Sequence, residues 1–410
     1  MSPGRALVLV ENLSVPFDRR VWQESVALRR EGYEVAVICP CGEKRDREPL
    51  EVREGVAIHR YPLTAATGGP LGYAREYAVA LWWTWRLARR LAAEEPFDVV
   101  QACNPPDILL LAAWRLRRGG ARFIFDHHDL VPELYLSRFD RGRDALYWLT
   151  VALERLTFAL ADVVVATNDS YRRVALTRGR KRSPDVFVVR SGPDLSRFRA
   201  VAPDPALKRG RSHLISYLGV MGPQDGVDHA LSALAHLDGR SDWHAVFIGE
   251  GDVWCEMKQL ARELGLASRV EFTGRIPDDD VARILSSSDV CVAPDPKNPL
   301  NDVSTMNKIL EYMAMSRPVV AYDLVEARVS AGPAALYGRP NDARSLAEAI
   351  ARLLDDPRLR ARMGAIGRSR VEGALAWEHS ESQLLAAYRR AIERPRRRRR
   401  RKARRTAGRP

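Results

Sequence analysis

The chain of 410 residues has few cysteines, no long apolar run and no glycine-rich dinucleotide fingerprint. Its five cysteines show no CxxC spacing, and no secretory leader pattern opens the sequence, so we expect a reducing compartment, the cytoplasm. No apolar run approaches the roughly 18 residues that a membrane-spanning helix needs. The loop after the first expected strand, residues 12–20, lacks GxGxxG, which argues against a dinucleotide-dependent dehydrogenase.

An excess of charge of one sign is also absent from most of the chain. The net charge is +13, but residues 394–410 contain eleven Lys or Arg and no acid, which leaves +2 for the rest. Such a block is typical of a disordered arm that is attracted to anionic surfaces without specificity. We therefore expect no specific nucleic-acid partner. A non-enzymatic nucleic-acid or membrane binder driven by this tail remains an alternative.

Strands alternate with helices along almost the whole chain, which predicts parallel sheets built from βαβ units. This pattern is interrupted at residues 191–212, where Pro, Gly and charged residues accumulate. That segment is the expected linker between an N-terminal domain, residues 1–190, and a C-terminal domain, residues 213–375. A helix at 376–393 is expected to pack back on the N-terminal domain, ahead of a disordered tail at 394–410.

The stretch 292–322 carries the strongest functional pattern, a buried strand, a polar loop, a helix and a second buried strand. Ser304 or Thr305 is expected to cap the helix, and Ser304, Lys308 and Glu311 fall on one of its faces. A helix start that follows a strand and a loop is a natural phosphate site, because free N–H groups and the positive dipole end meet there. The alternative is a solvated face with an ion pair between Lys308 and Glu311.

Two loops of the first half also carry candidate side chains. Asp18, Arg19 and Arg20 follow the first strand, where open α/β sheets place their sites. An ordinary helix cap with solvated arginines is the alternative. A second cluster, 126–129 (DHHD), follows the strand at 122–126 and predicts a hydrogen-bonding or acid–base role for one histidine. No metal is expected there, because adjacent strand residues point to opposite faces and no third ligand has suitable spacing.

The predicted helix at 73–94 combines aromatic and basic residues. It contains Trp82, Trp83 and Trp85 next to Arg86, Arg89 and Arg90. Tryptophan rings suit the headgroup level of a bilayer, where arginines meet anionic lipids. We therefore expect this helix, together with the tail, to attach the protein to the inner face of a membrane. The alternative is a packed helix whose arginines extend to solvent.

Several motifs taken in order resemble the retaining glycosyltransferases of family 4. They are PFDRRVWQE (16–24), ADVVVATNDSYRR (161–173), VVRSGPDLSRF (188–198), FIGEGD (247–252), VEFTGRIP (270–277) and NKILEYMAMSRPVVA (307–321). The resemblance covers about residues 5–390. It implies a GT-B fold, which is two Rossmann-like α/β domains with doubly wound parallel sheets facing a cleft. It also implies transfer of a sugar from a nucleotide-sugar donor, UDP- or GDP-linked, to a hydroxyl acceptor, with no metal or other cofactor.

The resemblance also gives roles to individual residues. Glu311 matches the second glutamate of the family's E-x7-E motif, which usually contacts the ribose, and Lys308 would stabilise the leaving diphosphate. Ser304 and Thr305 would face the phosphates or the donor sugar. His128 matches a histidine near the reacting sugar. The remaining donor contacts are Asp18, Arg19 and Arg20 in the first domain and Gly249, Glu250 and Arg275 in the second.

Two departures from the family pattern concern the donor's charge. Val303 stands where the first glutamate of the motif is expected, and the neighbouring Asp302 is the candidate replacement. The usual arginine and lysine are missing from residues 219–225 (GVMGPQD). Neutralisation of the diphosphate would then depend on Lys308, the helix dipole and Arg19 or Arg20. We expect a lipid-linked or polysaccharide acceptor in cell-surface biosynthesis, with a nucleotide-sugar epimerase as an alternative function.

Overall fold

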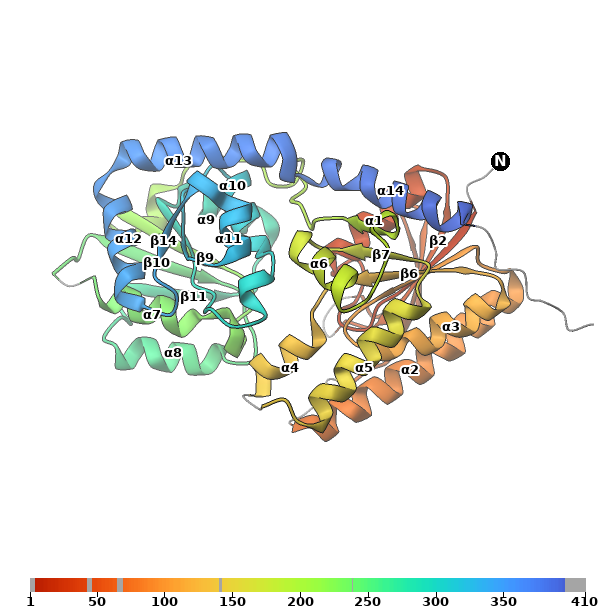
Figure 1. Ribbon diagram of the computed structural model, residues 1–410. Coiled ribbons are helices and arrows are strands. Elements are labelled where there is room, and N and C mark those ends of the chain that lie inside the picture. The colour runs from red at the N-terminus through yellow and green to blue at the C-terminus, as the bar shows by residue number, and fades with distance from the viewer. Residues whose placement is uncertain (1–3, 43–45, 65–68, 140–141, 238, 395–410) are drawn as a thin grey trace, which may run out of the picture.

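The computed structural model describes residues 4–42, 46–64, 69–139, 142–237 and 239–394. Two α/β domains lie side by side, each built on a parallel sheet, and the last two helices, α13 and α14, run along one edge of both (Figure 1). The segment 189–212 between the two sheets contains a single 3-10 turn, Pro205–Lys208, among its regular elements. The side-by-side arrangement exposes the ends of both sheets to the space between the domains.

The first domain, within the described residues, holds an eight-stranded sheet in the order β3-β4-β2-β1-β5-β6-β7-β8. All neighbours pair in parallel except β3 and β4, which form an antiparallel edge. The central strands are buried on both faces, as their near-continuous apolar sequences require. The strands are β1 Arg5–Leu9, β2 Glu34–Pro40, β3 Leu50–Arg53, β4 Val56–Tyr61, β5 Val99–Cys103, β6 Arg122–His127, β7 Val163–Ala166 and β8 Val186–Val188.

The second domain has a parallel sheet of six strands among the described residues, in the order β11-β10-β9-β12-β13-β14. The strand order reverses between β9 and β12, which is where open sheets of this type form their binding crevice. The strands are β9 His213–Leu218, β10 Trp243–Ile248, β11 Val270–Gly274, β12 Val290–Ala293, β13 Val319–Tyr322 and β14 Ala335–Gly338.

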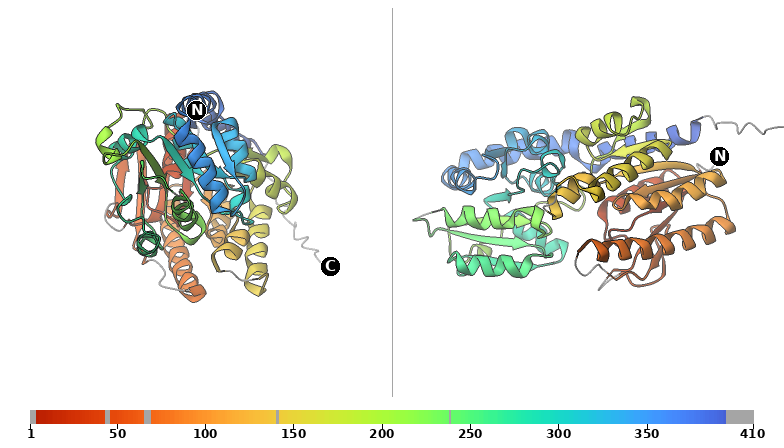
Figure 2. Two further views of the ribbon diagram at one scale, coloured as in Figure 1. Left: turned by 90° about the vertical axis from the view of Figure 1, so that its left-hand side faces the viewer. Right: turned by 60° about the horizontal axis from the view of Figure 1, so that its bottom comes forward.

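Helices cover both faces of each sheet (Figures 1 and 2). Among the described residues, every helix is too short or too polar to cross a bilayer. In the first domain the helices are α1 Arg19–Arg30, α2 Gly69–Glu94, α3 Leu110–Gly119, α4 Val131–Phe139, α5 Ala145–Leu160 and α6 Asp169–Thr177. In the second part they are α7 Val227–Ala235, α8 Trp254–Glu263, α9 Asp278–Ser287, α10 Asn307–Ala314, α11 Val325–Ala331, α12 Ala343–Asp355, α13 Pro357–Arg370 and α14 Trp377–Glu393.

The last helix, α14, belongs to the first domain's core although it follows the second domain in sequence. Its buried side chains join the cluster that also contains β1, β2 and β5 residues; they are Trp377, Leu384, Ala387, Tyr388 and Ala391. Separations of three, four and seven residues place them on one stripe of the helix, which faces the sheet. The chain therefore crosses between the domains twice, at 189–212 and again before α14.

Three local differences from the sequence-based expectations have physical reasons. The helix α4, Val131–Phe139, was not predicted, and α5 begins separately at Ala145 because Asp144 caps it by accepting from the Tyr147 N–H. The β3–β4 edge carries exposed residues and gives too short an apolar pattern to be recognised. The expected cap of α10 is wrong: its N-cap is Met306, which makes no side-chain cap bond.

Candidate active site

Loops that follow strands of both sheets meet between the two domains. Arg19, at the start of α1, donates to Oε1 of Glu311 on α10 at 3.2 Å. The Thr305 hydroxyl accepts from the Asn168 side chain at 3.0 Å, and the Ser304 hydroxyl lies 2.8 Å from that of Tyr171. Ser304 and Thr305 therefore do not cap α10, because their oxygens are used across the domain interface. A crevice of about 480 Å³ is lined by residues of both domains.

Arg20 organises the first domain's side of the interface, although it is buried and does not project into the crevice. Its guanidinium donates to Oδ1 of Asp126 at 2.8 Å, lies 3.1 Å from Glu24 and donates to the Val189 carbonyl at 2.7 Å. The neighbouring Asp18 is the N-cap of α1, accepting from the Val21 N–H at 3.0 Å. For Asp18 the cap alternative therefore describes the observed contact, whereas Arg20 is neither solvated nor exposed.

His128 lies against this network with Nε2 close to two groups. Nε2 is 2.9 Å from Nε of Arg20 and 2.8 Å from Oδ2 of Asp126, and only the second contact suits a protonated nitrogen. Burial opposes the charged ring, but the Asp126 carboxylate outweighs it and raises the pKa of His128 above its ordinary value. Burial also opposes ionisation of Asp126, yet Arg20 and His128 hold its pKa below the ordinary value. The Asp126 carboxylate therefore favours the protonated form of His128.

The network extends to the C-terminal helix through Gln101 on β5. Its amide nitrogen donates to Asp126 at 2.8 Å and to Glu24 at 2.6 Å, and its carbonyl accepts from the Tyr388 hydroxyl at 2.7 Å. Burial, partly offset by Arg20, raises the pKa of Glu24 to about 8, so this carboxyl carries a proton at neutral pH. Tyr388 thus connects α14 to the carboxylate that orients His128.

Cys103, Asp126 and His128 bring three ligand-type atoms within 4.8 Å of one another. The donor set does not suit a metal ion, because the Arg20 guanidinium occupies Asp126 and would repel a cation. Burial and the nearby Asp126 charge also raise the pKa of the Cys103 thiol well above its ordinary value, so it is not a thiolate. The cluster acts as a hydrogen-bonded support for His128.

Lys308 is the corresponding cation of the second domain. Its ammonium donates to Oδ1 of Asp295 at 2.6 Å and lies 3.8 Å from Asp225, and the side chain is 8% exposed. The solvated face and the Lys308–Glu311 ion pair considered above are therefore wrong. Burial opposes the charge, but the two carboxylates outweigh it and raise the pKa of Lys308 above its ordinary value. Burial raises the pKa of Asp225 to about 6 despite Lys308.

Two glycines bring backbone close to Lys308. A Cβ at Gly219, which follows β9, would lie 3.2 Å from Cε of Lys308. Gly249 follows β10 with φ near +124°, and a Cβ there would lie 1.9 Å from the Gly219 carbonyl oxygen. Only glycine permits this approach. The role of Gly249 in the fold is therefore to pack two strand-ending loops over the ammonium.

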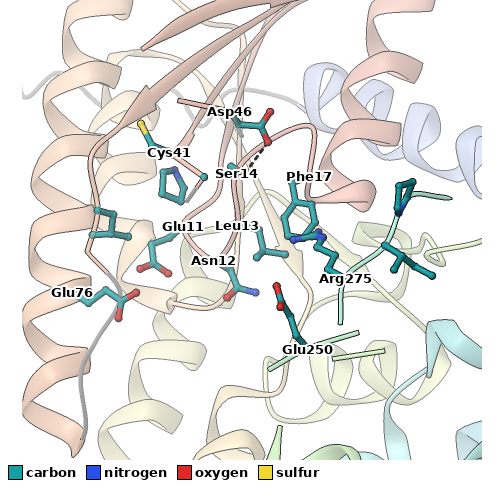
Figure 3. A pocket seen from close by; sticks show the side chains of 15 residues that line it. Glu11, Asn12, Leu13, Ser14, Phe17, Cys41, Asp46, Glu76, Glu250 and Arg275 are labelled. Atoms are coloured by element: carbon teal, nitrogen blue, oxygen red, sulfur yellow. Dashed lines mark hydrogen bonds between the residues drawn. The ribbon is translucent and has the colours of Figure 1, made fainter. Parts of the chain in front are cut away.

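The crevice itself is lined by other predicted residues. Glu250 and Arg275 line it from the second domain, and Arg275 places its guanidinium 3.5 Å from the ring centroid of Phe17 (Figure 3). Lys308, Glu311, His128 and Ser304 are not among its lining residues. The predicted residues therefore form two groups, one around the Arg19–Glu311 contact and one along the crevice.

Asp302 makes its contacts elsewhere, within the second domain. Its carboxylate accepts from the Val325 N–H at 3.1 Å and lies 3.5 Å from Nζ of Lys297. These contacts place its charge at the start of α11, within the second domain. These contacts do not support the prediction that Asp302 replaces the glutamate that is missing from the motif.

Four polar residues that belong to the Asp126–His128 network or contact Lys308 were not predicted from the sequence. They are Gln101, Tyr388, Asp225 and Asp295. For Asp295 a signal existed, because an acid that directly follows a buried strand must find a partner in the loop region. For Gln101, a polar residue within the buried strand 99–103 gave a similar hint. The other two lacked any local pattern.

Comparison with known proteins agrees with this architecture. Residues 18–192 match the model of the glycosyl transferase 4-like domain, and residues 212–356 match that of the glycosyl transferases group 1. The chain is 27% identical over 372 residues to 2-deoxystreptamine glucosyltransferase of Streptomyces kanamyceticus, covering 88% of this chain and 83% of that protein. It is 25% identical to a GDP-mannose-dependent alpha-(1-6)-phosphatidylinositol monomannoside mannosyltransferase of Mycobacterium tuberculosis, covering 80% and 82%.

Other curated relatives are matched over a shorter span. The chain is 30% identical to alpha-D-kanosaminyltransferase of Streptomyces kanamyceticus over 43% of its own length, and it spans about half the length (45%) of that protein. Among solved structures, sucrose-phosphate synthase from Thermosynechococcus elongatus superposes with a TM-score of 0.78 at 22% identity, covering 94% of this chain and 98% of that one. Anabaena HepE in complex with UDP-glucose superposes with a TM-score of 0.67 at 16% identity, covering 93% and 98%. The two domain matches and the shared architecture together assign this GT-B chain to glycosyltransferase family 4, the group 1 glycosyltransferases.

Proposed function

We propose that the protein transfers a sugar from a nucleotide-sugar donor to an acceptor hydroxyl with retention of the anomeric configuration. The observation that carries the proposal is the meeting of the α10 region with the first domain, where Glu311 contacts Arg19 and the Gly219 and Gly249 loops cover Lys308. In a donor complex, Glu311 would bind the ribose, and the backbone of these loops with Lys308 would face the diphosphate. The donor is UDP- or GDP-linked in this proposal.

The chemistry requires stabilisation of a leaving diphosphate. An ammonium has three protons, and Asp295 and Asp225 account for two directions around Lys308, so one N–H remains for a phosphate oxygen. A fixed cation and backbone N–H groups aimed at developing negative charge lower the barrier by about 3 kcal/mol for each donor. The leaving phosphate oxygen then takes the acceptor proton. His128, held by Asp126 and Arg20, would contact the donor sugar from the first domain.

The proposal for the acceptor and its location is supported by exposed residues of the first domain. The relatives named above differ in acceptor, one name giving 2-deoxystreptamine and the other a phosphatidylinositol monomannoside. We propose a lipid-linked or surface-polysaccharide acceptor at an anionic membrane surface. On α2 the side chains of Trp82 and Trp85 are 50% and 37% exposed, with Arg86 and Arg89 stacked on them at 5.4 and 4.9 Å.

Two further helices of the first domain also carry an exposed tryptophan each. Trp114 on α3 and Trp148 on α5 are 39% and 55% exposed, and α3 packs between α2 and α5 (Figures 1 and 2). Trp83, in contrast, packs against the first domain's core. The helix α2 therefore has one face packed against the core, through Trp83, and another exposed to solvent, with Trp82 and Trp85. The basic tail, 395–410, lies outside the described residues.

The decisive experiment measures release of nucleoside diphosphate from UDP- and GDP-sugars with and without acceptor extract. We expect release from one donor, only when acceptor is present, and loss of donor-induced thermal stabilisation in Glu311→Gln. Glu348→Gln on the exposed surface of α12 is the matched control. Product NMR that shows an inverted anomeric centre would contradict retention, and a converted nucleotide sugar without acceptor would favour the epimerase alternative.

A further inference from the structure

Glu11, which lies just after β1, is a buried carboxyl group with one oxygen that no described residue satisfies. Its side chain is 4% exposed, and Oε1 is buried with no hydrogen-bond partner among the described residues. Native proteins rarely leave such an oxygen unsatisfied, because desolvation without a replacement bond costs about 1–3 kcal/mol. Glu11 also lines the interdomain crevice, where its carboxyl group lies among the side chains drawn in Figure 3. The missing partner therefore belongs to whatever fills the crevice.

The charged and titratable groups around Glu11 are mostly acidic. Besides Glu11, the described lining residues contribute the carboxyl groups of Asp46, Glu76 and Glu250 and one guanidinium, that of Arg275. Asp46 is partly neutralised, because Arg60 lies 3.8 Å away and Ser14 donates to it at 3.0 Å. Among the described residues, the titratable groups near Glu11 come from α2, from β4, from residues 41 and 46 and from the second domain: Glu76, Tyr77, Tyr61, Cys41, Asp46, Glu250 and Arg275.

This environment sets the protonation of Glu11 in the ligand-free protein. Burial, assisted by the charge of Glu76, raises the pKa of Glu11 from its ordinary value near 4.5 to about 8. The group is therefore largely neutral at pH 7. A cation placed against it would restore the carboxylate and release the proton, whereas a neutral hydroxyl would accept or donate a bond without changing its charge.

We propose that Glu11 and the acidic wall of the crevice form a subsite for a protonated amino group on a carbohydrate unit of the acceptor. The assignment to the acceptor depends on the proposed transferase function and on the lining of the crevice, most of which comes from the first domain. An ammonium donates three hydrogen bonds and is attracted by the three remaining carboxyl groups. A phosphate group at the same position would be repelled by them.

Calorimetry with four small probes tests the subsite on the full chain at pH 7. The probes are glucosamine, which carries an ammonium, N-acetylglucosamine and glucose, which are neutral, and glucose 6-phosphate, which is anionic. We expect glucosamine to bind at least tenfold more tightly than the other three, the range of a charge-assisted hydrogen bond. Comparing buffers of different ionisation enthalpy should show proton release with glucosamine and none with the neutral sugars.

The Glu11→Gln variant removes the ionisable group at this position but keeps the shape of the side chain. Because Glu11 is neutral without ligand, the amide is a close substitute and should fold normally. We expect it to lose the tenfold preference and the proton release, while glucose and N-acetylglucosamine bind as they do to the wild type. Glu348→Gln, on an exposed helix face, should retain both. If Glu11→Gln were to misfold, binding of the four probes to the wild type and the measured proton release would still test the subsite.

Outcomes for this subsite and for the transferase function are distinguishable. Equal binding of glucosamine and N-acetylglucosamine, no measurable binding of glucosamine, or an unchanged preference in Glu11→Gln would each overturn the subsite and leave nucleotide binding untouched. Failure of both UDP and GDP to bind would remove the proposed transferase function but not a glucosamine preference that depends on Glu11.

Discussion

The two sides of the interdomain space hold their charges differently. In the first domain, Arg20, Asp126 and His128 form a buried network in which each charged group has a charged partner. In the second domain, Lys308 is held by Asp295 and Asp225 beneath the Gly219 loop, close to the interface. The first arrangement fixes the position of one ring, whereas the second keeps a cation at a glycine-lined surface. In the proposed function, the first domain would position groups and the second would bind the donor's charged diphosphate.

The largest effects are expected at Lys308, where a single and a double variant distinguish a catalytic role of the charge from a structural one. Lys308→Met alone leaves Asp295 buried without its cation and should lower the free energy of unfolding by about 3–5 kcal/mol. Adding Asp295→Asn should recover most of that stability, while sugar transfer stays about a hundredfold or more below the wild type. Chemical denaturation and nucleoside diphosphate release measure the two quantities. Near-normal transfer in the stable double variant would show that Lys308 is structural only.

Two adjacent arginines provide the next contrast. Arg20→Met should lower the free energy of unfolding by about 3–5 kcal/mol, because Asp126 loses its buried guanidinium. Arg19→Met should cost less than about 1 kcal/mol, because Arg19 is 45% exposed and its ion pairs with Asp278 and Glu311 are screened. Arg19→Met should instead raise the Michaelis constant of the donor. Equal unfolding free energies for the two variants would contradict the division between a buried network and an interface contact.

The difference in pH dependence between the wild type and Glu11→Gln measures the raised pKa of Glu11. Its pKa is raised to about 8 in the folded protein, mainly by burial, so the folded state holds a proton that the unfolded chain releases. Stability should therefore fall as the pH rises from about 4.5 to about 8. Glu11→Gln should remove the contribution of Glu11 to this slope, leaving those of Glu24 and Asp225, and should be more stable than the wild type at pH 9 by on the order of 5 kcal/mol. Thermal unfolding across that pH range, with parallel wild-type and Glu11→Gln curves, would exclude the raised pKa.

A smaller effect is expected where α14 meets the first domain's network. Tyr388→Phe leaves the Gln101 carbonyl without its donor and should cost about 1–2 kcal/mol of stability. Because Gln101 also holds Asp126, we expect a shift in the pH profile of kcat and little change in the donor's Michaelis constant. An unchanged pH profile with the same loss of stability would make Tyr388 a packing residue without influence on His128.

Periodicity in the sequence predicted the elements that place the site, but not the contacts between them. The strand–loop–helix–strand pattern at 292–322 corresponds to β12, α10 and β13, because buried strands and an amphipathic helix leave clear local signals. The contact of Tyr388 with Gln101 joins residues 287 positions apart, so no local pattern contains it. The pairing of Lys308 with Asp295 was not predicted for a different reason. The periodicity of a helix groups residues of that helix only, and Asp295 lies in the preceding loop. The catalytic and binding roles of the site residues remain predictions that the variants above test.

The most direct measurement is the affinity for UDP and GDP of three proteins, namely wild type, Asp295→Asn and the Lys308→Met/Asp295→Asn double variant. If the second domain holds the donor's diphosphate with Lys308, Asp295→Asn should bind one of the two nucleotides at least as tightly as the wild type, because it releases the ammonium from its carboxylate. The double variant should bind that nucleotide at least tenfold more weakly. Equal affinity of the single and double variants would contradict a diphosphate held by Lys308 between the two domains.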